Sequence, residues 1–362
     1  MSVPACETLV EVSSNPTGMA LVVLGTGVVG GALLSLLQTP VARRLRLVGV
    51  ANSRQQQVDA AGLSLRELPQ AWQQHGKPRN DAALLAALDA SGTALKVVVD
   101  ATACGQLASC HADWLARGYH VVTANKSLAG GHLAGWRALQ AARAHGGRYG
   151  DAATVGAGLP VISTLRRLRD CGDSLLTLEG VFSGSLSYLF NQYDGTQPFS
   201  ALLRDARRLG YTEPDPRSDL SGEDVARKLL ILARNAGFAL SREELMVESL
   251  VPEALRDISS DQFLDRLKEL DEPLARRHAE ASSRGHVLRY LARLNQRGHA
   301  RVGLVEVAAS HPAARLYGTD NQFAFTTMRY NTQPLVIQGP GAGPEVTAQA
   351  LLGDVLALTQ GA

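Results

Sequence analysis

A glycine-rich turn near the amino terminus constrains the fold of this chain of 362 residues more than any other feature. Residues 20–30, ALVVLGTGVVG, predict an apolar strand that runs into the spacing G-x-G-x-x-G, and the helical run ALLSLLQ follows. A second apolar strand is predicted at residues 45–52, which completes the opening of a βαβ unit. Such glycines let a backbone approach a pyrophosphate at the helix N-terminus, so the pattern predicts a dinucleotide site, with a tight structural turn as the alternative. The residues predicted to form the site are Gly25, Thr26, Gly27, Val28, Val29 and Gly30.

The end of the second strand indicates which dinucleotide the site prefers. Enzymes that bind NAD usually place Asp or Glu there, where the carboxylate accepts a hydrogen bond from the ribose 2′-hydroxyl. This sequence has Asn52, Ser53 and Arg54 instead, and the next carboxylate is Asp59. A neutral, hydrogen-bonding pair followed by Arg suits a 2′-phosphate. The sequence therefore favours NADP(H) and leaves NAD(H) open.

Further strands alternate with helical runs up to about residue 150. Asn80 is predicted to cap a helix, and strands are predicted at residues 96–100 and 119–124. This alternation is typical of a parallel, doubly wound sheet of the Rossmann type. Ligands bind at the carboxyl ends of such strands, so we expect the polar residues there to line the cofactor crevice. These residues are Thr102, Thr123, Asn125 and Lys126.

The sequence becomes glycine-rich and then helical beyond the first domain. A second, α+β domain is predicted, with strands at residues 175–182 and 303–309 in a sheet of mixed order and a charged helical region at 241–297. The final strand, Gly/Pro loop and apolar helix could return to the first domain. The predicted divisions are 1–18 for a loosely ordered leader, 19–150 for the nucleotide-binding domain, 151–332 for the second domain and 333–362 for the returning segment.

The stretch GYTEPDPRSDLSGEDVARK, residues 210–228, concentrates charge and proline. Its two prolines exclude a helix in the first half. Ser221 is predicted to cap a helix over GEDVARKLLILARNAGF. Asp224 and Lys228 stand four residues apart and therefore on one face of that helix. A rigid acidic loop beside an acid and an amine can hold a small zwitterion; the alternative is a solvated turn with a surface ion pair worth about 0.3–0.5 kcal/mol.

Charge and composition exclude several classes of protein. The formal net charge of +2 gives no case for a nucleic-acid or membrane partner. Residues 19–42 carry no charge, but their clustered glycines and the lack of a basic start argue against a membrane span or a targeting signal. Four cysteines without a C-x-x-C pair predict reduced thiols and a cytoplasmic protein. No histidines stand at metal spacing, so no transition metal is predicted.

Several specific motifs occur together: GTGVVG, VVTANK, TVGAGLP, FSGSLSYLFN, the acidic stretch above and GPGAGPEVT. With them the chain resembles the homoserine dehydrogenase family from about residue 20 to its end, and in particular the dehydrogenase half of bifunctional aspartokinase–homoserine dehydrogenases. Without a kinase-length region, a monofunctional enzyme is expected. The resemblance implies NAD(P)H-dependent interconversion of L-aspartate 4-semialdehyde and L-homoserine, in the route to threonine and methionine. It also implies a dimerisation and substrate domain, in a homodimer or homotetramer.

The resemblance further implies roles for individual residues. Glu213 would bind the amino group of the substrate. Asp219 and Asp224 would line its pocket, with Asp224 near the reacting oxygen. Lys228 would transfer the proton, and Lys126 would supply a second amine on the nicotinamide side. The other implied contacts are Ser183, Gly184, Ser185 and Tyr188 around the substrate carboxylate and Gly343 beside the cofactor.

The two lysines fit this chemistry on physical grounds. Aldehyde reduction builds negative charge on oxygen, so ammonium groups near that oxygen stabilise the transition state. A lysine with its ordinary pKa of ~10.4 is a poor base near neutral pH. We hypothesise that Lys126 and Lys228 face the same oxygen and lower each other's pKa, whereas Asp224 raises the pKa of Lys228. Loss of either lysine should then remove the basic limb of the pH–rate profile.

One departure from the family concerns a monovalent cation. Family members can hold an ion such as Na⁺ with backbone carbonyls of the VGAGLP loop and a carboxylate just before it. Val155 and Ala157 supply carbonyls here, but Ala152 stands at the acidic position and Asp151 comes one residue early. The sequence leaves open whether this loop binds sodium or is structural only.

Two other functions compete with this interpretation. One is a different dehydrogenase of small hydroxy or amino acids, which would accept substrates without an α-amino group. The other is a non-catalytic, NADP-binding regulatory protein. Loss of the acidic or lysine residues would have favoured the regulatory protein, and all four remain in place: Glu213, Asp224, Lys126 and Lys228.

Overall fold

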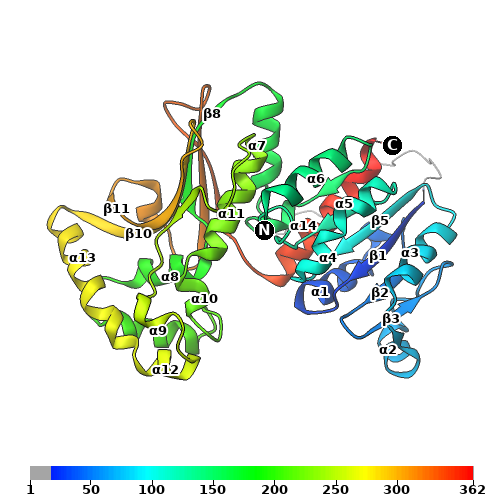
Figure 1. The fold of residues 1–362 in the computed structure, drawn as a ribbon, viewed down its shortest axis with the longest axis horizontal. Helices are drawn as coiled ribbons and strands as arrows, with labels where there is room; N and C mark the ends of the chain where they lie inside the picture. Colours follow the sequence, from blue (N-terminus) through cyan, green and yellow to red (C-terminus); the bar gives the residue numbers. More distant parts are fainter. Residues whose placement is uncertain (1–17, 362) are drawn as a thin grey trace, which may run out of the picture.

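The computed structural model describes residues 18–361, with the side chains at 71, 73–75 and 360–361 excepted. The predicted leader, apart from its last residue, and Cys6 lie outside the described residues. Two β-sheets organise the chain into two units that lie side by side (Figure 1). After the ligands predicted for them, we call the unit with strands β1–β7 the nucleotide unit and the unit with strands β8–β13 the substrate unit.

The nucleotide unit contains a seven-stranded sheet in the order β4-β3-β2-β1-β5-β6-β7. The strands β2, β1, β5, β6 and β7 run parallel, as the sequence predicts, and the chain order reverses between β1 and β5. The antiparallel β3 and β4 at the edge escaped the sequence because QQQV and KP lack an apolar pattern. The bounds are β1 Met19–Leu24, β2 Leu45–Ala51, β3 Gln55–Val58, β4 Lys77–Pro78, β5 Leu95–Asp100, β6 His120–Thr123 and β7 Tyr149–Gly150.

Helices cover both faces of this sheet because its central strands are apolar on both faces. Alternate residues of β1 belong to two separate cores: Leu21 and Val23 pack with α1 (Val28–Leu36) and α14 (Pro344–Ala357). Val22 packs with α3 (Asp81–Ala90), α5 (His111–Ala116) and α6 (Leu133–Arg143) on the opposite face. The predicted cap of α3 is confirmed, since Asn80 accepts a hydrogen bond from the amide of Ala83. The doubly wound fold predicted from the sequence is thus confirmed.

The substrate unit contains a six-stranded sheet in the order β13-β12-β8-β10-β11-β9, antiparallel except for the pair β9 and β11. Helices pack on one face of it, with α8, α11 and α13 against β10. The strand bounds are β8 Leu175–Val181, β9 Leu245–Val247, β10 His286–Asn295, β11 Ala300–Ala308, β12 Asp320–Thr327 and β13 Leu335–Pro340. The helix bounds are α7 Val161–Asp170, α8 Gly184–Gln192, α9 Phe199–Arg208, α10 Arg217–Leu220, α11 Glu223–Asn235, α12 Ser260–Asp265 and α13 Asp271–Ser283.

The charged region at residues 241–297 was predicted to be helical, and this prediction is only partly correct. It ends in β10, a ten-residue strand at the centre of the sheet. Its middle residues are buried on both faces, so it lacks the polar–apolar alternation that marks a half-exposed strand. Arg289 and Arg293 within it also resemble the charges of a surface helix.

The last thirty residues divide between the two units. The strand β13 pairs with β12 in the substrate unit, whereas α14 packs against α1 in the nucleotide unit. The strand therefore does not accompany the helix to the first sheet. Gly341 and Gly343 lie in the connection between them, and Gly343 has a φ of +136°, a conformation that side chains disfavour.

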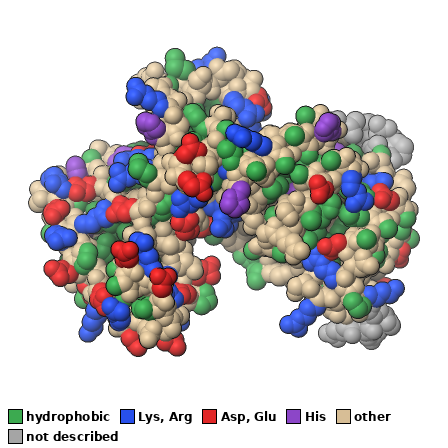
Figure 2. All heavy atoms as spheres, viewed as in Figure 1, with side chains coloured by type: hydrophobic (Ala, Val, Ile, Leu, Met, Phe, Trp, Pro, Cys, Tyr) green, Lys and Arg blue, Asp and Glu red, His purple; other side chains and the backbone are tan. Residues whose placement is uncertain are grey.

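Two properties predicted from composition can be compared with the structure. No helix among residues 18–361 is long and apolar enough to cross a membrane. Cys104, Cys110 and Cys171 are free thiols. Acidic and basic side chains are interspersed over the face shown in Figure 2.

Candidate active site

A cleft of about 930 Å³ lies between the two units and collects most of the predicted site residues. The nucleotide unit lines it with the start of α1 and the ends of β5 and β6; the substrate unit lines it with α8, the acidic stretch and α11. The predicted residues that line the cleft are Val28, Val29, Thr102, Lys126, Ala157, Ser183, Gly184, Ser185, Glu213, Asp219, Asp224, Lys228 and Gly343.

The glycine turn at the start of α1 is shaped by close backbone contacts. Gly25 has a φ of +99°, and a Cβ placed on Gly30 would lie 1.9 Å from the carbonyl oxygen of Gly25. Gly27 is the N-cap of α1, has no side-chain cap, and has nothing within 4 Å of a Cβ placed on it. Packing within the chain thus explains Gly25 and Gly30 but not Gly27. Open amides at this helix start and the exposed Val28 fit a pyrophosphate and nicotinamide.

The turn at the end of β2 is held by the predicted residue Asn52 and by Arg79, which was not predicted from the sequence. The side chain of Asn52 accepts hydrogen bonds from the amides of Arg54 and Gln55, at 2.7 and 2.9 Å, and so shapes its own turn. Arg79, which follows β4, donates to the carbonyl of Asn52 at 3.1 Å and pairs with Asp81 at 2.7 Å. Its Nη2 is buried without a hydrogen-bond partner among the described residues. Only the three-dimensional pairing of β3 with β4 brings Arg79 to this turn.

A buried aspartate fixes the loops that follow β5 and β6. Asp100 accepts hydrogen bonds from the amide and hydroxyl of Thr102, from Asn125 at 2.9 Å, and contacts His111 at 3.0 Å. Thr123 is fully buried; its hydroxyl donates to the carbonyl of Asp100 and accepts from the amide of Asn125. The prediction that Thr123 and Asn125 line the crevice is therefore wrong, because both side chains face inward. They hold in place Thr102 and Lys126, which do reach it.

Two lysines meet one aspartate in the cleft. Asp224 lies 2.9 Å from Lys228 through Oδ2 and 3.4 Å from Lys126 through Oδ1. Lys228 also donates a hydrogen bond of 2.7 Å to the carbonyl of Phe182, and only 8% of the residue is exposed. The alternative of a solvated surface pair is therefore excluded for Lys228. The i,i+4 spacing predicted the pairing with Asp224, but not the arrival of Lys126 from the other unit.

Burial and charge act together on this cluster. Burial lowers the pKa of Lys126, and the neighbouring charge of Lys228 lowers it further, whereas Asp224 opposes the shift. Burial alone would raise the pKa of Asp224, but the two ammonium groups hold that pKa well below its ordinary value. Asp224 is therefore ionised near neutral pH. The predicted effect of Lys228 on Lys126 is present, but burial is the larger cause.

The substrate end of the cleft combines acids with a helix start. Asp219 accepts hydrogen bonds from the hydroxyl of Ser185 at 2.6 Å and from the amide of Glu213 at 2.9 Å, while burial raises its pKa. The carboxylate of Glu213 has no partner among the described residues and faces the cleft. Ser183 caps α8 by accepting from the amide of Leu186. Tyr188 does not line the cleft; it packs against Tyr211, which does.

The start of α11 differs from the prediction. Ser221 ends the short helix α10, and the N-cap of α11 is Gly222, with a φ of +74°. A Cβ on Gly222 would lie 1.9 Å from the hydroxyl of Tyr290 on β10, which leaves room only for glycine. The left-handed turn thereby redirects the chain so that Asp224 and Lys228 face the cleft.

The residues present do not fit a cation site that needs a carboxylate. Asp151 is fully buried, and its carboxylate pairs with Arg166 at 2.8 Å. The amide of Ala152 donates to Asp354, so neither residue offers a free acid to the loop. No group of three or more His, Cys, Asp or Glu among residues 18–361 could hold a metal ion. In the same loop the backbone of Ala157 is left-handed, with a φ of +52° that residues other than glycine rarely adopt.

Family models match both parts of this architecture. The model described as "Homoserine dehydrogenase, NAD binding domain" matches residues 25–149, and the model "Homoserine dehydrogenase" matches residues 160–356. The chain belongs to the homoserine dehydrogenase family. The resemblance stated from the motifs is confirmed, and the nucleotide unit is a nicotinamide-cofactor domain of this family.

Individual relatives of the homoserine dehydrogenase family agree over most of the chain. Bifunctional aspartokinase/homoserine dehydrogenase 2 of Zea mays is 44% identical over 355 residues, covering 95% of this chain and 39% of the relative. Homoserine dehydrogenase of Saccharomyces cerevisiae is 41% identical over 271 residues, covering 73% of this chain and 75% of the relative. A crystal structure of a Candida auris protein of unknown function superposes with a TM-score of 0.89 at 34% identity, covering 95% and 99% of the two chains. The chain spans about two-fifths of the length of the bifunctional plant relatives.

Proposed function

We propose that this protein is an active homoserine dehydrogenase, which interconverts L-aspartate 4-semialdehyde and L-homoserine with NAD(P)H on the route to threonine and methionine. The observation that carries the proposal is the cluster of Lys126, Asp224 and Lys228 at the junction of the two units. Reduction of the aldehyde needs a proton donor and positive charge at the oxygen, beside the cofactor. The free thiols described above support a reducing compartment such as the cytoplasm.

The geometry of the cluster supports a separate role for each of its residues. When bound in the nucleotide unit, NAD(P)H supplies the hydride. Lys228 donates its proton to the aldehyde oxygen as negative charge develops there, and takes a proton back in the reverse reaction. The ammonium of Lys126 stabilises the same oxygen from the nucleotide side. Asp224 contacts both Nζ atoms and stays ionised throughout, which offsets the repulsion between the two ammonium groups.

The ends of the substrate are recognised separately. The unpartnered carboxylate of Glu213 binds the ammonium group of the substrate. The substrate carboxylate binds at the start of α8, where the amides of Gly184 and Ser185 lie at the positive end of a nine-residue helix. Asp219 holds both sites in register, since it bonds Ser185 and the backbone of Glu213.

The turn after β2 favours the phosphorylated cofactor. No carboxylate follows β2 until Asp59; the amide of Arg54 donates to the side chain of Asn52, and the guanidinium of Arg79 donates to the carbonyl of Asn52. An arginine within the turn and a second guanidinium bound to its backbone suit a 2′-phosphate. We therefore propose NADP(H) as the preferred cofactor, with NAD(H) as the weaker alternative.

The initial rate of NADPH oxidation with L-aspartate 4-semialdehyde tests the proposal, with NADH and a des-amino aldehyde as controls. Rapid turnover that requires the amino group supports the reaction and the role of Glu213 together. Equal rates with the des-amino aldehyde point instead to a dehydrogenase of broader substrates. Binding of NADPH without turnover of either aldehyde favours the regulatory protein.

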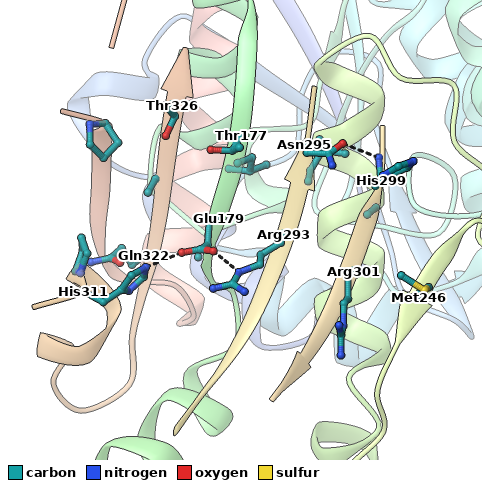
Figure 3. A pocket seen from close by; sticks show the side chains of 17 residues that line it. Thr177, Glu179, Met246, Arg293, Asn295, His299, Arg301, His311, Gln322 and Thr326 are labelled. Carbon is teal, nitrogen blue, oxygen red and sulfur yellow. Dashed lines mark hydrogen bonds and ion pairs between the residues drawn. The ribbon is translucent and has the colours of Figure 1, made fainter. Parts of the chain in front are cut away.

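We also propose that the chain forms a homodimer through the open face of the substrate-unit sheet. The helices cover one face, whereas the other is hollowed by about 490 Å³ and lined by Thr177, Glu179, Arg293, Arg301 and Thr326 (Figure 3). The neighbouring Met246 is 63% exposed, which is unusual for a large apolar side chain. Light scattering after size exclusion should show a dimer that Ala324→Glu on this face converts to a monomer. Val41→Glu, on the nucleotide unit, is the control; a monomeric wild type contradicts the proposal.

A further inference from the structure

Arg234, near the end of α11, is a buried cation without a counter-charge. The residue is 3% exposed, and no carboxylate among the described residues lies within ion-pair distance of it. Its guanidinium donates only to backbone carbonyls, at 2.7 Å to Ala129, 2.8 Å to Gly131 and 3.0 Å to Leu240. Burial lowers its pKa to about 10. Burying an arginine against carbonyl groups alone is unfavourable, so its position calls for a specific gain.

Two of these carbonyls belong to the other unit. Ala129 and Gly131 lie in the turn that directly follows Lys126, and the carbonyl of Lys126 itself accepts a hydrogen bond of 2.8 Å from the amide of Gly130. The same helix α11 carries Asp224 and Lys228. Arg234 thus connects the segment that presents one lysine of the cleft to the helix that presents the other.

The contact continues along one side of α11. Asp224 and Arg234 are ten residues apart, and Arg227 lies between them at helical spacing, so the three side chains share a face over about 15 Å. Asp224 contacts Lys126, and the stem of Arg227 lies against Gly130, where an added Cβ would be 2.3 Å from its Cγ. The turn at 126–131 therefore rests on α11 at three successive points.

We propose that Arg234 is a positioning residue that fixes Lys126 against Asp224 and Lys228 by holding the 126–131 turn on α11. The inference rests on the proposed reaction, in which both ammonium groups face one oxygen. The Lys126–Asp224 contact alone is too weak for this task, because it is 3.4 Å long and its side chains are 31% and 47% exposed. Arg234, with four hydrogen bonds in a buried site, supplies the missing constraint.

A second arginine provides a matched control. Arg289 on β10 is 6% exposed and also donates only to backbone carbonyls: those of Phe190, Leu288, Ala313 and Ala314. All of its partners lie within the substrate unit, away from the cleft. Replacing either arginine removes the same kind of buried network, but only Arg234 bridges to the segment of Lys126.

The experiment compares Arg234→Met and Arg234→Lys with Arg289→Met and Arg289→Lys, and adds Gly130→Ala to separate the turn from α11 without removing a charge. We expect kcat to fall about 10- to 100-fold in the Arg234 variants and in Gly130→Ala, since a displacement of about 1 Å at a reacting group costs about that much. The KM for NADPH should stay within about twofold, because the glycine turn is untouched. The Arg289 variants should lose thermal stability but keep kcat within about threefold.

A readout that does not depend on turnover accompanies the kinetics. Acylation of Lys126 by a limiting amine reagent, followed by peptide mass spectrometry, should accelerate in the Arg234 variants and not in the Arg289 variants. Equal losses of kcat at the two arginines, with unchanged reactivity of Lys126, overturn the positioning role. If a Met variant does not fold, the Lys pair and Gly130→Ala decide by the same criteria. A wild type that turns over neither aldehyde overturns the proposed function, while the reactivity of Lys126 still decides the positioning role.

Discussion

The two sides of the cleft recognise their ligands with different parts of the chain. On the nucleotide side the cleft is formed mainly by backbone, at the start of α1. The lack of side chains at Gly25, Gly27 and Gly30 gives this turn its shape. On the substrate side the groups are ionised side chains, led by Asp224 and Lys228. Shape governs the first side and charge the second. A methyl group should therefore damage the first side, and a neutral isostere the second.

The largest effect is expected from removing charge on the substrate side at constant shape. Lys228→Met keeps the length of the side chain but removes the proposed proton donor, so kcat should fall by about 10²- to 10⁴-fold, the usual contribution of a general acid. NADPH binding, followed by fluorescence titration, should be retained. Lys96→Met is the control, because Lys96 also pairs with an aspartate, Asp89, at 2.9 Å, but on the surface of the nucleotide unit. A Lys228→Met enzyme that fails to bind NADPH would place this lysine on the wrong side of the comparison.

The converse change adds one methyl group to the nucleotide side. In Gly30→Ala the new Cβ meets the carbonyl oxygen of Gly25 at 1.9 Å, so the turn must open. We expect the dissociation constant of NADPH to rise about 100-fold, the effect of a displacement near 1 Å. Gly31→Ala is the matched control, because its Cβ has nothing within 4 Å outside its own helix. Comparable losses in both variants would mean that helix α1, and not the turn, is sensitive.

A smaller charge effect is expected at the far end of the substrate. Glu213→Gln removes the charge proposed to bind the substrate ammonium, which should lower kcat/KM for L-aspartate 4-semialdehyde about 10- to 100-fold, as a lost charge-assisted hydrogen bond predicts. The rate with the des-amino aldehyde should not change. Glu253→Gln, an exposed residue outside the cleft, controls for net charge. An equal loss on both aldehydes would assign Glu213 to the fold of the acidic stretch.

Arg79 is a charged residue on the nucleotide side, and it tests how far the comparison extends. Arg79→Leu should reduce the preference for NADPH over NADH about tenfold, because one charge-assisted contact to the 2′-phosphate is lost. The ratio of kcat/KM for the two cofactors measures this directly. Arg46→Leu is the control for loss of a surface arginine. Arg46 lies near the start of β2, away from the turn that Arg79 contacts, and also donates to a backbone carbonyl, that of Ser91. An unchanged ratio would leave recognition on this side to the backbone alone.

The features that could be predicted from the sequence are those whose geometry is set locally. The glycine turn, Asn80 and the Asp224–Lys228 pair are local, because their geometry follows from spacing along one strand or helix. Arg79, Arg234 and the meeting of Lys126 with Asp224 are not local, since each needs two segments that only the tertiary fold brings together.

Buried polar residues were the other source of error. A polar residue after a strand predicts a ligand contact, but Thr123 and Asn125 instead satisfy the carboxylate and carbonyl of Asp100. Similarly, β10 lacks the alternating strand pattern because its middle residues are buried on both faces. The sequence cannot distinguish a polar group that faces a ligand from one that faces the interior of its own protein.

The smallest effect is expected from monovalent cations at the VGAGLP loop. The sequence has Ala152 at the acidic position, and the structure shows why Asp151 does not replace it: its Oδ2 accepts a hydrogen bond of 2.8 Å from Arg166, and its Oδ1 lies 2.8 Å from the same guanidinium, which also bonds Asn235. The guanidinium already supplies positive charge next to this loop. Exchange of sodium and potassium for choline at constant ionic strength should therefore change kcat by less than about twofold, since general screening is unaltered. Saturable activation by sodium would show that backbone carbonyls alone, such as those of Val155 and Ala157, suffice to bind the ion.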